Sequence, residues 1–86
     1  MMRKRVLVVD DDPEILDMLR LHLEREDMEV VTAEKGEDAL EILRKDNIQV
    51  QVLDLQLPGM NGIRLCKKIR EDYPIAIIIA ITGYAS

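Results

Sequence analysis

The chain has 86 residues, the length of one small domain, and carries a formal net charge of −5. This acidic balance argues against direct nucleic-acid binding, which needs a basic face to neutralise phosphates. The apolar content of 48% excludes a disordered segment, yet the longest apolar run is too short to cross a membrane. No signal peptide opens the chain, so we expect a soluble cytoplasmic protein.

The first part of the chain predicts a strand followed by a helix. Arg5–Val9 is a β-branched run of strand length that ends in acidic residues. Asp12 then suits a helix cap and Pro13 the first turn of that helix. The apolar residues that follow recur at helical spacing, and we expect them to face the core: Ile15, Met18, Leu19 and Leu23.

The rest of the chain continues this alternation of apolar runs and amphipathic stretches. It predicts a strand over 28–33, a helix over 37–45, a strand over 50–54, a helix over 62–71 and a strand over 75–81. Strands that recur roughly every 20 to 25 residues, with helical patterns between them, are typical of βαβ units. We therefore predict an α/β fold with a doubly wound parallel sheet.

Chemically active side chains follow three of the predicted strands. Asp10 and Asp11 follow the first strand, Asp54 ends the third, and Thr82 follows the fourth. Such sheets bind ligands beyond the carboxyl ends of their strands. If strands one and three are neighbours, three carboxylates converge there, and their mutual repulsion favours a bound cation. Oxygen ligands without histidine or cysteine favour Mg²⁺, beside which a carboxylate can attack phosphorus and Thr82 can contact a phosphoryl oxygen.

Three segments resemble the receiver domains of two-component response regulators, in the order and at about the spacing of that family: VVDDDP at 8–13, LDLQLPGMNG at 53–62 and ITGYAS at 81–86. The resemblance covers the whole chain. It implies a flavodoxin-like receiver fold with the sheet order 2-1-3-4. It also implies that residues 1–86 form the N-terminal two-thirds of one receiver domain.

The resemblance also implies a role for each site residue. Asp54 would accept a phosphoryl group from the phosphohistidine of a histidine kinase, with Mg²⁺ as cofactor. Asp10 and Asp11 would be the acidic metal-binding pair, with Asp11 the more direct ligand, and the backbone carbonyl of Gln56 would complete the metal shell. The hydroxyl of Thr82 would follow the phosphoryl group. The implied function is that of a phosphoacceptor signalling module in a phosphorelay, not of an enzyme.

A second function stays open because the sequence departs from the family's pattern. A receiver domain continues through a further helix, a fifth strand and a last helix, and the lysine that ends the fifth strand pairs with the phosphoryl group. These 86 residues contain no match for that lysine. The alternative is therefore a folded fragment that cannot be phosphorylated. Its apolar edge strand, Ile75–Ile81, would lead it to form a homodimer.

A third interpretation is a magnesium-dependent phosphohydrolase with an aspartate nucleophile after the first strand. Asp10 and Asp12 fit its two acids, but Pro13 and Glu14 follow where that class has a threonine, and Asp54 would have no role. We rank this class third, because Asp12 is best explained as a helix cap. One further residue is unusual. Gln51 places an amide in a buried strand, which requires a hydrogen-bond partner or marks a less covered face.

Overall fold

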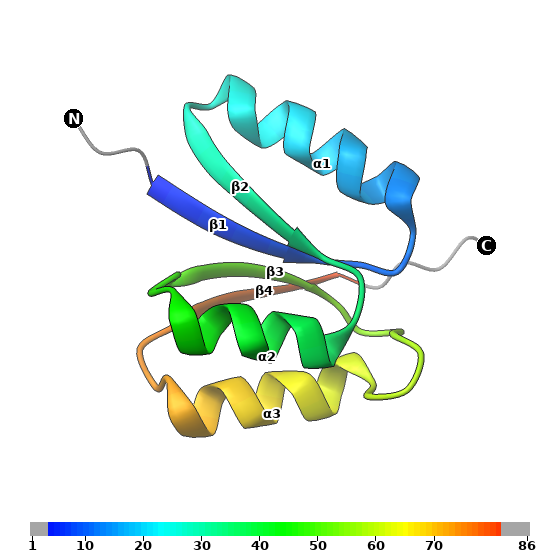
Figure 1. Cartoon of the computed structure of the whole chain (residues 1–86), viewed down its shortest axis with the longest axis vertical. Coiled ribbons are helices and arrows are strands. Elements are labelled where there is room, and N and C mark those ends of the chain that lie inside the picture. Colours follow the sequence, from blue (N-terminus) through cyan, green and yellow to red (C-terminus); the bar gives the residue numbers. More distant parts are fainter. Residues whose placement is uncertain (1–3, 82–86) are drawn as a thin grey trace.

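Strands and helices alternate strictly along the chain in the computed structural model, which describes residues 4–81 (Figure 1). The elements are β1 (Lys4–Val9), α1 (Pro13–Arg25), β2 (Met28–Ala33), α2 (Gly36–Lys45), β3 (Val50–Asp54), α3 (Gly62–Asp72) and β4 (Ile77–Ile81). Among these elements, no helix has the length and apolar character that a membrane span requires.

All four strands are parallel, and they lie in the order β2-β1-β3-β4. This order confirms the predicted arrangement 2-1-3-4. Val6 of β1 pairs with Val30 of β2 on one side and with Val50 of β3 on the other. Because β1 and β3 are neighbours and run in the same direction, their carboxyl ends meet at one edge of the sheet.

Two apolar layers hold the helices against the sheet. Helices α2 and α3 cover one face (Figure 1), where Leu7, Val9 and Leu53 of the strands share a buried cluster with Leu65 and Ile69 of α3. Helix α1 covers the other face and packs on β1 and β2: Val6, Val8, Leu16, Val30 and Val52 form that layer. On this second face β4 is poorly covered, since the side chains of Ile77 and Ile79 are 57% and 50% exposed.

Helix α1 begins at the predicted residue, but the set of its side chains that faces the core differs from the predicted one. The side chain of Asp12 accepts a hydrogen bond from the backbone N–H of Glu14 (3.0 Å), which confirms the cap. Within the helix, however, Leu16 is buried and Met18 is 50% exposed, so the predicted core position of Met18 is wrong. Leu16, Leu19 and Leu23 lie one above the other, and this stripe faces β1 and β2.

The fourth strand begins at Ile77, so the predicted start at Ile75 is wrong. The backbone N–H of Ala76 donates to the carbonyl oxygen of Tyr73 (3.1 Å), which closes a turn around Pro74. Pairing with the neighbouring segment starts only when the N–H of Ile77 donates to the carbonyl oxygen of Gln49 (2.8 Å). The turn geometry thus overrides the apolar character of Ile75.

Gln51 is completely buried, on the side of β3 that faces α2 and α3 with Leu53. Its Nε2 donates to the carbonyl oxygen of Ile48 (3.0 Å), which confirms the expected partner for the amide. Its Oε1 has no hydrogen-bond partner among residues 4–81. The suggestion that Gln51 marks a less covered face is wrong at this position, because the side chain of Gln51 is fully covered.

Candidate metal centre

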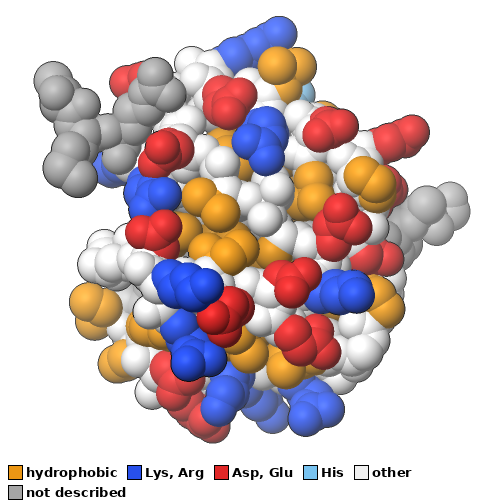
Figure 2. Space-filling model, in the orientation of Figure 1, with side chains coloured by type: hydrophobic (Ala, Val, Ile, Leu, Met, Phe, Trp, Pro, Cys, Tyr) orange, Lys and Arg blue, Asp and Glu red, His pale blue; other side chains and the backbone are white. Residues whose placement is uncertain are grey.

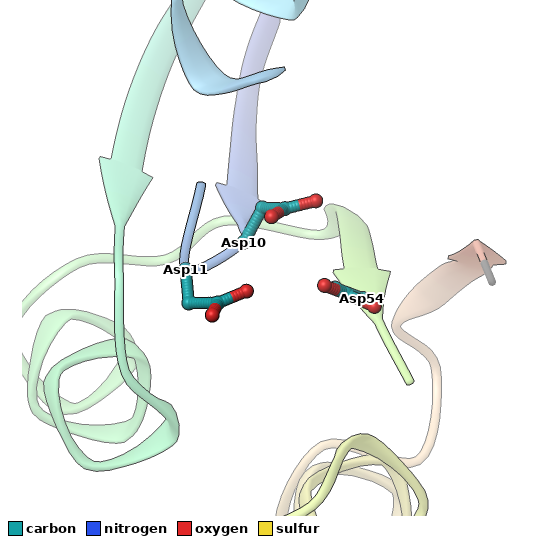
Figure 3. Close-up of side chains that lie close together, drawn as sticks. All are labelled: Asp10, Asp11 and Asp54. Carbon is teal, nitrogen blue, oxygen red and sulfur yellow. The ribbon is translucent and has the colours of Figure 1, made fainter. Parts of the chain in front are cut away.

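Three carboxylates converge at the carboxyl edge of the sheet (Figure 3). Asp10 extends the pairing of β1, since its backbone N–H donates to the carbonyl oxygen of Ala33 at the end of β2 (3.1 Å). Asp11 follows it, and Asp54 is the last residue of β3. One carboxylate oxygen from each of the three residues lies within 4.8 Å of the other two. The adjacency of β1 and β3 therefore assembles the predicted acidic cluster.

Asp10 and Asp54 are held in place by short-range hydrogen bonds, whereas Asp11 is exposed. Oδ1 of Asp10 accepts from the backbone N–H of Asp12 (2.9 Å), and Oδ1 of Asp54 accepts from that of Gln56 (2.9 Å). Each bond closes a small turn that fixes the rotamer of the aspartate. Asp10 is 1% exposed, and its second oxygen, Oδ2, has no hydrogen-bond partner among the described residues. A buried carboxylate oxygen of this kind favours a bound cation.

The electrostatics of the cluster disfavour its fully ionised, metal-free form. Burial raises the pKa of Asp10 above its ordinary value, and repulsion from Asp54 and Asp11 raises it further. The hydrogen bond from the Asp12 amide acts in the opposite direction but does not cancel the rise. A cation between the carboxylates would relieve the repulsion and replace part of the lost hydration.

The loop between β3 and α3 returns closely to the end of β3. The N–H of Gly62 donates to the carbonyl oxygen of Leu55 (3.1 Å), and any Cβ at Gly62 would overlap the carbonyl of Asp54 and the backbone of Leu55. Earlier in the loop, Gly59 has a φ of 75°, which glycine adopts without strain. Because glycine has no Cβ, Gly62 allows α3 to begin this close to Asp54.

Asn61 caps α3 beside the site, a role that we did not predict from the sequence. Its Oδ1 accepts a hydrogen bond from the backbone N–H of Arg64 (2.9 Å), so it caps α3 where the loop meets the helix. The signal was present, because asparagine directly before a helical pattern is among the most favoured caps. A second missed contact lies at Gly36, where an added Cβ would be 3.2 Å from Sδ of Met60 in the same loop.

The structure brings together three of the five predicted site residues. Gln56 is exposed, and its backbone N–H donates to Oδ1 of Asp54. The role of its backbone carbonyl as a metal ligand stays a prediction. Thr82 lies outside the described residues, so its role also stays a prediction. Asp12 caps α1, while Asp54 belongs to the cluster. This arrangement counts against a phosphohydrolase that would use Asp12 and leave Asp54 without a role.

The donor set of the cluster fits a hard divalent cation. Asp10, Asp11 and Asp54 offer only carboxylate oxygens, and neither histidine nor cysteine belongs to the group. Oxygen-only sites suit Mg²⁺ or Ca²⁺, and Mg²⁺ keeps several water ligands when few carboxylates are available. The exposure of Asp11 leaves one side of the cluster open to such waters or to a phosphate oxygen.

Comparison with known sequences gives one consistent family. A family model described as "Response regulator receiver domain" matches residues 6–86. The heme response regulator HssR of Staphylococcus aureus (strain JH9) is 41% identical over 73 residues, which make up 85% of this chain and 33% of that protein. The chain thus spans about a third of the length of the curated relatives it matches.

Solved structures agree with the fold in detail. The response regulator TrrA of Thermotoga maritima, in complex with Mg²⁺-BeF, is 40% identical with a TM-score of 0.90, over 95% of this chain and 71% of that one. TrrA in complex with the histidine kinase ThkA gives a TM-score of 0.89 at 40% identity, over 96% and 72% of the two chains. The chemotaxis protein CheY4 of Vibrio cholerae is 31% identical with a TM-score of 0.91, over 99% and 72%.

Proposed function

Because this chain belongs to the response regulator receiver domain family, we propose that it accepts a phosphoryl group on Asp54 from a histidine kinase. The chain is a receiver domain of a two-component signalling system. We take residues 1–86 as the N-terminal two-thirds of one receiver domain, in line with the 71–72% of the solved chains that they cover. TrrA in complex with a histidine kinase supports a kinase as the partner of this chain.

The observation that carries this proposal is the convergence of Asp10, Asp11 and Asp54 within 4.8 Å. We assign these three residues, with the backbone carbonyl of Gln56, to a Mg²⁺ site. When bound, Mg²⁺ supplies positive charge that neutralises the transferring group. TrrA in complex with Mg²⁺-BeF supports this choice of cofactor.

Asp54 is the residue best placed to act as the nucleophile. Its Oδ1 is held by the Gln56 amide, which orients the carboxylate and leaves Oδ2 for attack on phosphorus. A bond forms between this oxygen and phosphorus while the phosphorus–nitrogen bond of the donor breaks, and the donor imidazole takes up a proton from solvent. Thr82 would donate its hydroxyl to a phosphoryl oxygen. The burial of Asp54 limits the access of water to the acyl phosphate formed.

The test is the intact mass of the chain after incubation with Mg²⁺ and acetyl phosphate. We expect a gain of one phosphoryl group in the parent protein and none in Asp54→Asn. Asp12→Asn is the matched control. It makes the same chemical change at an aspartate that lies beside the cluster in sequence but caps α1, so this variant should still be phosphorylated. Phosphorylation of Asp54→Asn to the same extent would disprove the assignment of the acceptor.

The alternative function, a folded module that is not phosphorylated, makes a different prediction in the same experiment. Mg²⁺ binding would then be measurable by calorimetric titration, but the mass would not increase. Such a result would mean that the cluster forms without completing the transfer. A chain that shows neither Mg²⁺ binding nor a mass increase would contradict the proposed phosphoacceptor and its Mg²⁺ site and leave only the folded module.

Self-association through β4 is the second part of that alternative, and one observation favours it. Ile77 and Ile79 are exposed, and among the described strands β4 pairs only with β3. Such an apolar edge is a template for another strand, so we propose a two-fold dimer through residues 77–81. Light scattering at micromolar concentration should give the mass of a dimer for the parent and of a monomer for Ile79→Lys. A monomeric parent would refute this dimer.

A further inference from the structure

A pocket of ≈ 340 Å³ lies at the edge of the sheet opposite to the acidic cluster. It is lined by residues at the carboxyl ends of α2 and α3 and just before β3 and β4, and we call it the helix-end pocket. Figure 1 shows these element ends near one another. The length of β3 separates it from Asp54 by about 13 Å along the strand. Its volume is at the lower end of the range for small-molecule sites, which leaves room for a body of about one ring.

The walls of the helix-end pocket are apolar and held by hydrogen bonds. Buried side chains of Leu43, Ile48 and Ala76 line its inner part. The hydroxyl of Tyr73 donates to the carbonyl oxygen of Leu43 (3.1 Å), which links the ends of the two helices. Arg70 donates to the carbonyl oxygens of Pro74 (3.1 Å) and Ala76 (2.6 Å), which fixes the turn on the other side. The pocket is therefore preformed.

The rim of the pocket is negatively charged. Its polar lining residues are Asp46, Asn47, Gln49 and Asp72, and among the described residues no lysine, arginine or histidine belongs to the lining. The carboxyl ends of α2 and α3 add the negative ends of two helix dipoles. Lys and Arg side chains gather over α3 at the bottom of Figure 2. Of the basic residues of α3, Arg70 is held beside the pocket, where its guanidinium already donates to the carbonyl oxygens of Pro74 and Ala76.

The neighbouring basic residues are already engaged elsewhere. Arg44 and Lys45, in the last turn of α2, pair with Glu41 at 3.1 Å and 3.5 Å. Arg5 pairs with Asp46 at 2.6 Å, so that carboxylate is partly neutralised. The carboxylate of Asp72 makes no hydrogen bond or ion pair with any other residue in the described range 4–81. Asp72 is thus the free charge at the rim.

We propose that the helix-end pocket binds a small organic cation with a flat apolar body of one ring and an amidinium or ammonium head. The body would fill the space over Leu43, Ile48 and Ala76, and the head would pair with Asp72. An anion would be repelled by the unpaired carboxylate of Asp72, whereas the charge of Asp46 is partly neutralised by Arg5. A metal ion is not the occupant, because the only group of three or more metal-compatible side chains among the described residues is Asp10, Asp11 and Asp54.

Benzamidine is the probe for this proposal, and amide chemical shifts of the ¹⁵N-labelled chain are the readout. We expect shifts centred on residues 43–49 and 72–76, with a dissociation constant on the order of 1 mM, as is normal for a one-ring fragment. Asp72→Asn should weaken binding by about three- to ten-fold, because one charge-assisted hydrogen bond becomes neutral. The matched control Asp17→Asn removes one exposed acid on α1 and should bind like the parent.

Neutral benzamide separates charge recognition from simple filling of an apolar space. It has nearly the same shape as benzamidine, and we expect it to bind at least five-fold more weakly if the rim selects a cation. Equal binding of the two probes would overturn the proposed selectivity. Shifts centred on residues 10–12 and 54–56, or no shifts at millimolar benzamidine, would overturn the site itself. Asp72 is exposed at a helix end, so Asp72→Asn should keep the parent's spectrum away from the pocket.

Discussion

Asp10→Asn should stabilise the metal-free protein, although Asp10 belongs to the proposed metal site. The substitution removes a buried charge from a cluster of three carboxylates. Oδ1 of the asparagine keeps the acceptor for the Asp12 amide, and its NH₂ group replaces the buried Oδ2 that lacks a hydrogen-bond partner among the described residues. That NH₂ group can donate to a neighbouring carboxylate, so repulsion is exchanged for attraction.

The magnitude follows from the distances in the cluster. Two unit charges at the outer limit of 4.8 Å repel by about 3.5 kcal/mol at an effective dielectric constant of 20. Because Asp11 is exposed and its charge is screened, the pair that matters is Asp10 with Asp54. We expect a net gain of about 1–3 kcal/mol in the free energy of unfolding, which raises the melting temperature by about 4–8 °C per kcal/mol in a domain of this size.

Thermal unfolding followed by circular dichroism in EDTA measures this gain, and its pH dependence gives a second check. The pKa of Asp10 is raised in the folded state, so the penalty for its charge is absent below the ordinary value of 3.8 and grows as the pH rises through the raised pKa. The difference between the variant and the parent should therefore be largest at pH 7 and should vanish towards pH 4.

Added Mg²⁺ should reverse the order of the melting temperatures, so that the parent melts above Asp10→Asn. It stabilises a folded state that binds it, and the parent has one carboxylate ligand more than Asp10→Asn. Asp12→Asn is the control, because asparagine also caps helices well and this variant should melt like the parent in EDTA. If Asp10→Asn melts below the parent in EDTA at pH 7, the charge of Asp10 is not a net cost and the electrostatic argument is wrong.

Four further substitutions test the local structure around the site. Gly62→Ala should lower the free energy of unfolding in urea by about 2–4 kcal/mol, because its Cβ meets the backbone at Asp54, whereas Gly59→Ala should cost only about 1 kcal/mol; equal losses would contradict this. Gln51→Glu should destabilise the protein by at least about 2 kcal/mol at pH 7 and recover as the pH falls, because burial raises the pKa of a carboxyl group there. A loss independent of pH would assign the effect to the lost NH₂ donor to the carbonyl oxygen of Ile48 and not to the buried charge. Asp12→Ala should cost about 1 kcal/mol through loss of the α1 cap, and a variant as stable as the parent would show that the bond to Glu14 contributes nothing.

Local patterns in the sequence were sufficient for the order of elements and for the chemistry of the site. β-Branched runs indicated the strands, and Asp12 with Pro13 indicated the start of α1, because caps and first turns depend on neighbouring residues only. The acids after the strands, at Asp10, Asp11 and Asp54, followed from the same runs. The resemblance to receiver domains gave the sheet order, which the spacing of the strands does not contain.

The tertiary structure decided which of these residues share an environment. The pairing of β1 with β3 closes the acidic cluster and buries Asp10 and Asp54 while Asp11 stays exposed. Helical spacing alone did not say that Leu16 would face the sheet instead of Met18, because that choice depends on where α1 lies over β1 and β2. The helix-end pocket joins residues 43–49 to residues 72–76, and no local pattern predicts it. Spacing along a chain sets the conformation of near neighbours, whereas burial, charge coupling and pockets arise from contacts between segments far apart in sequence.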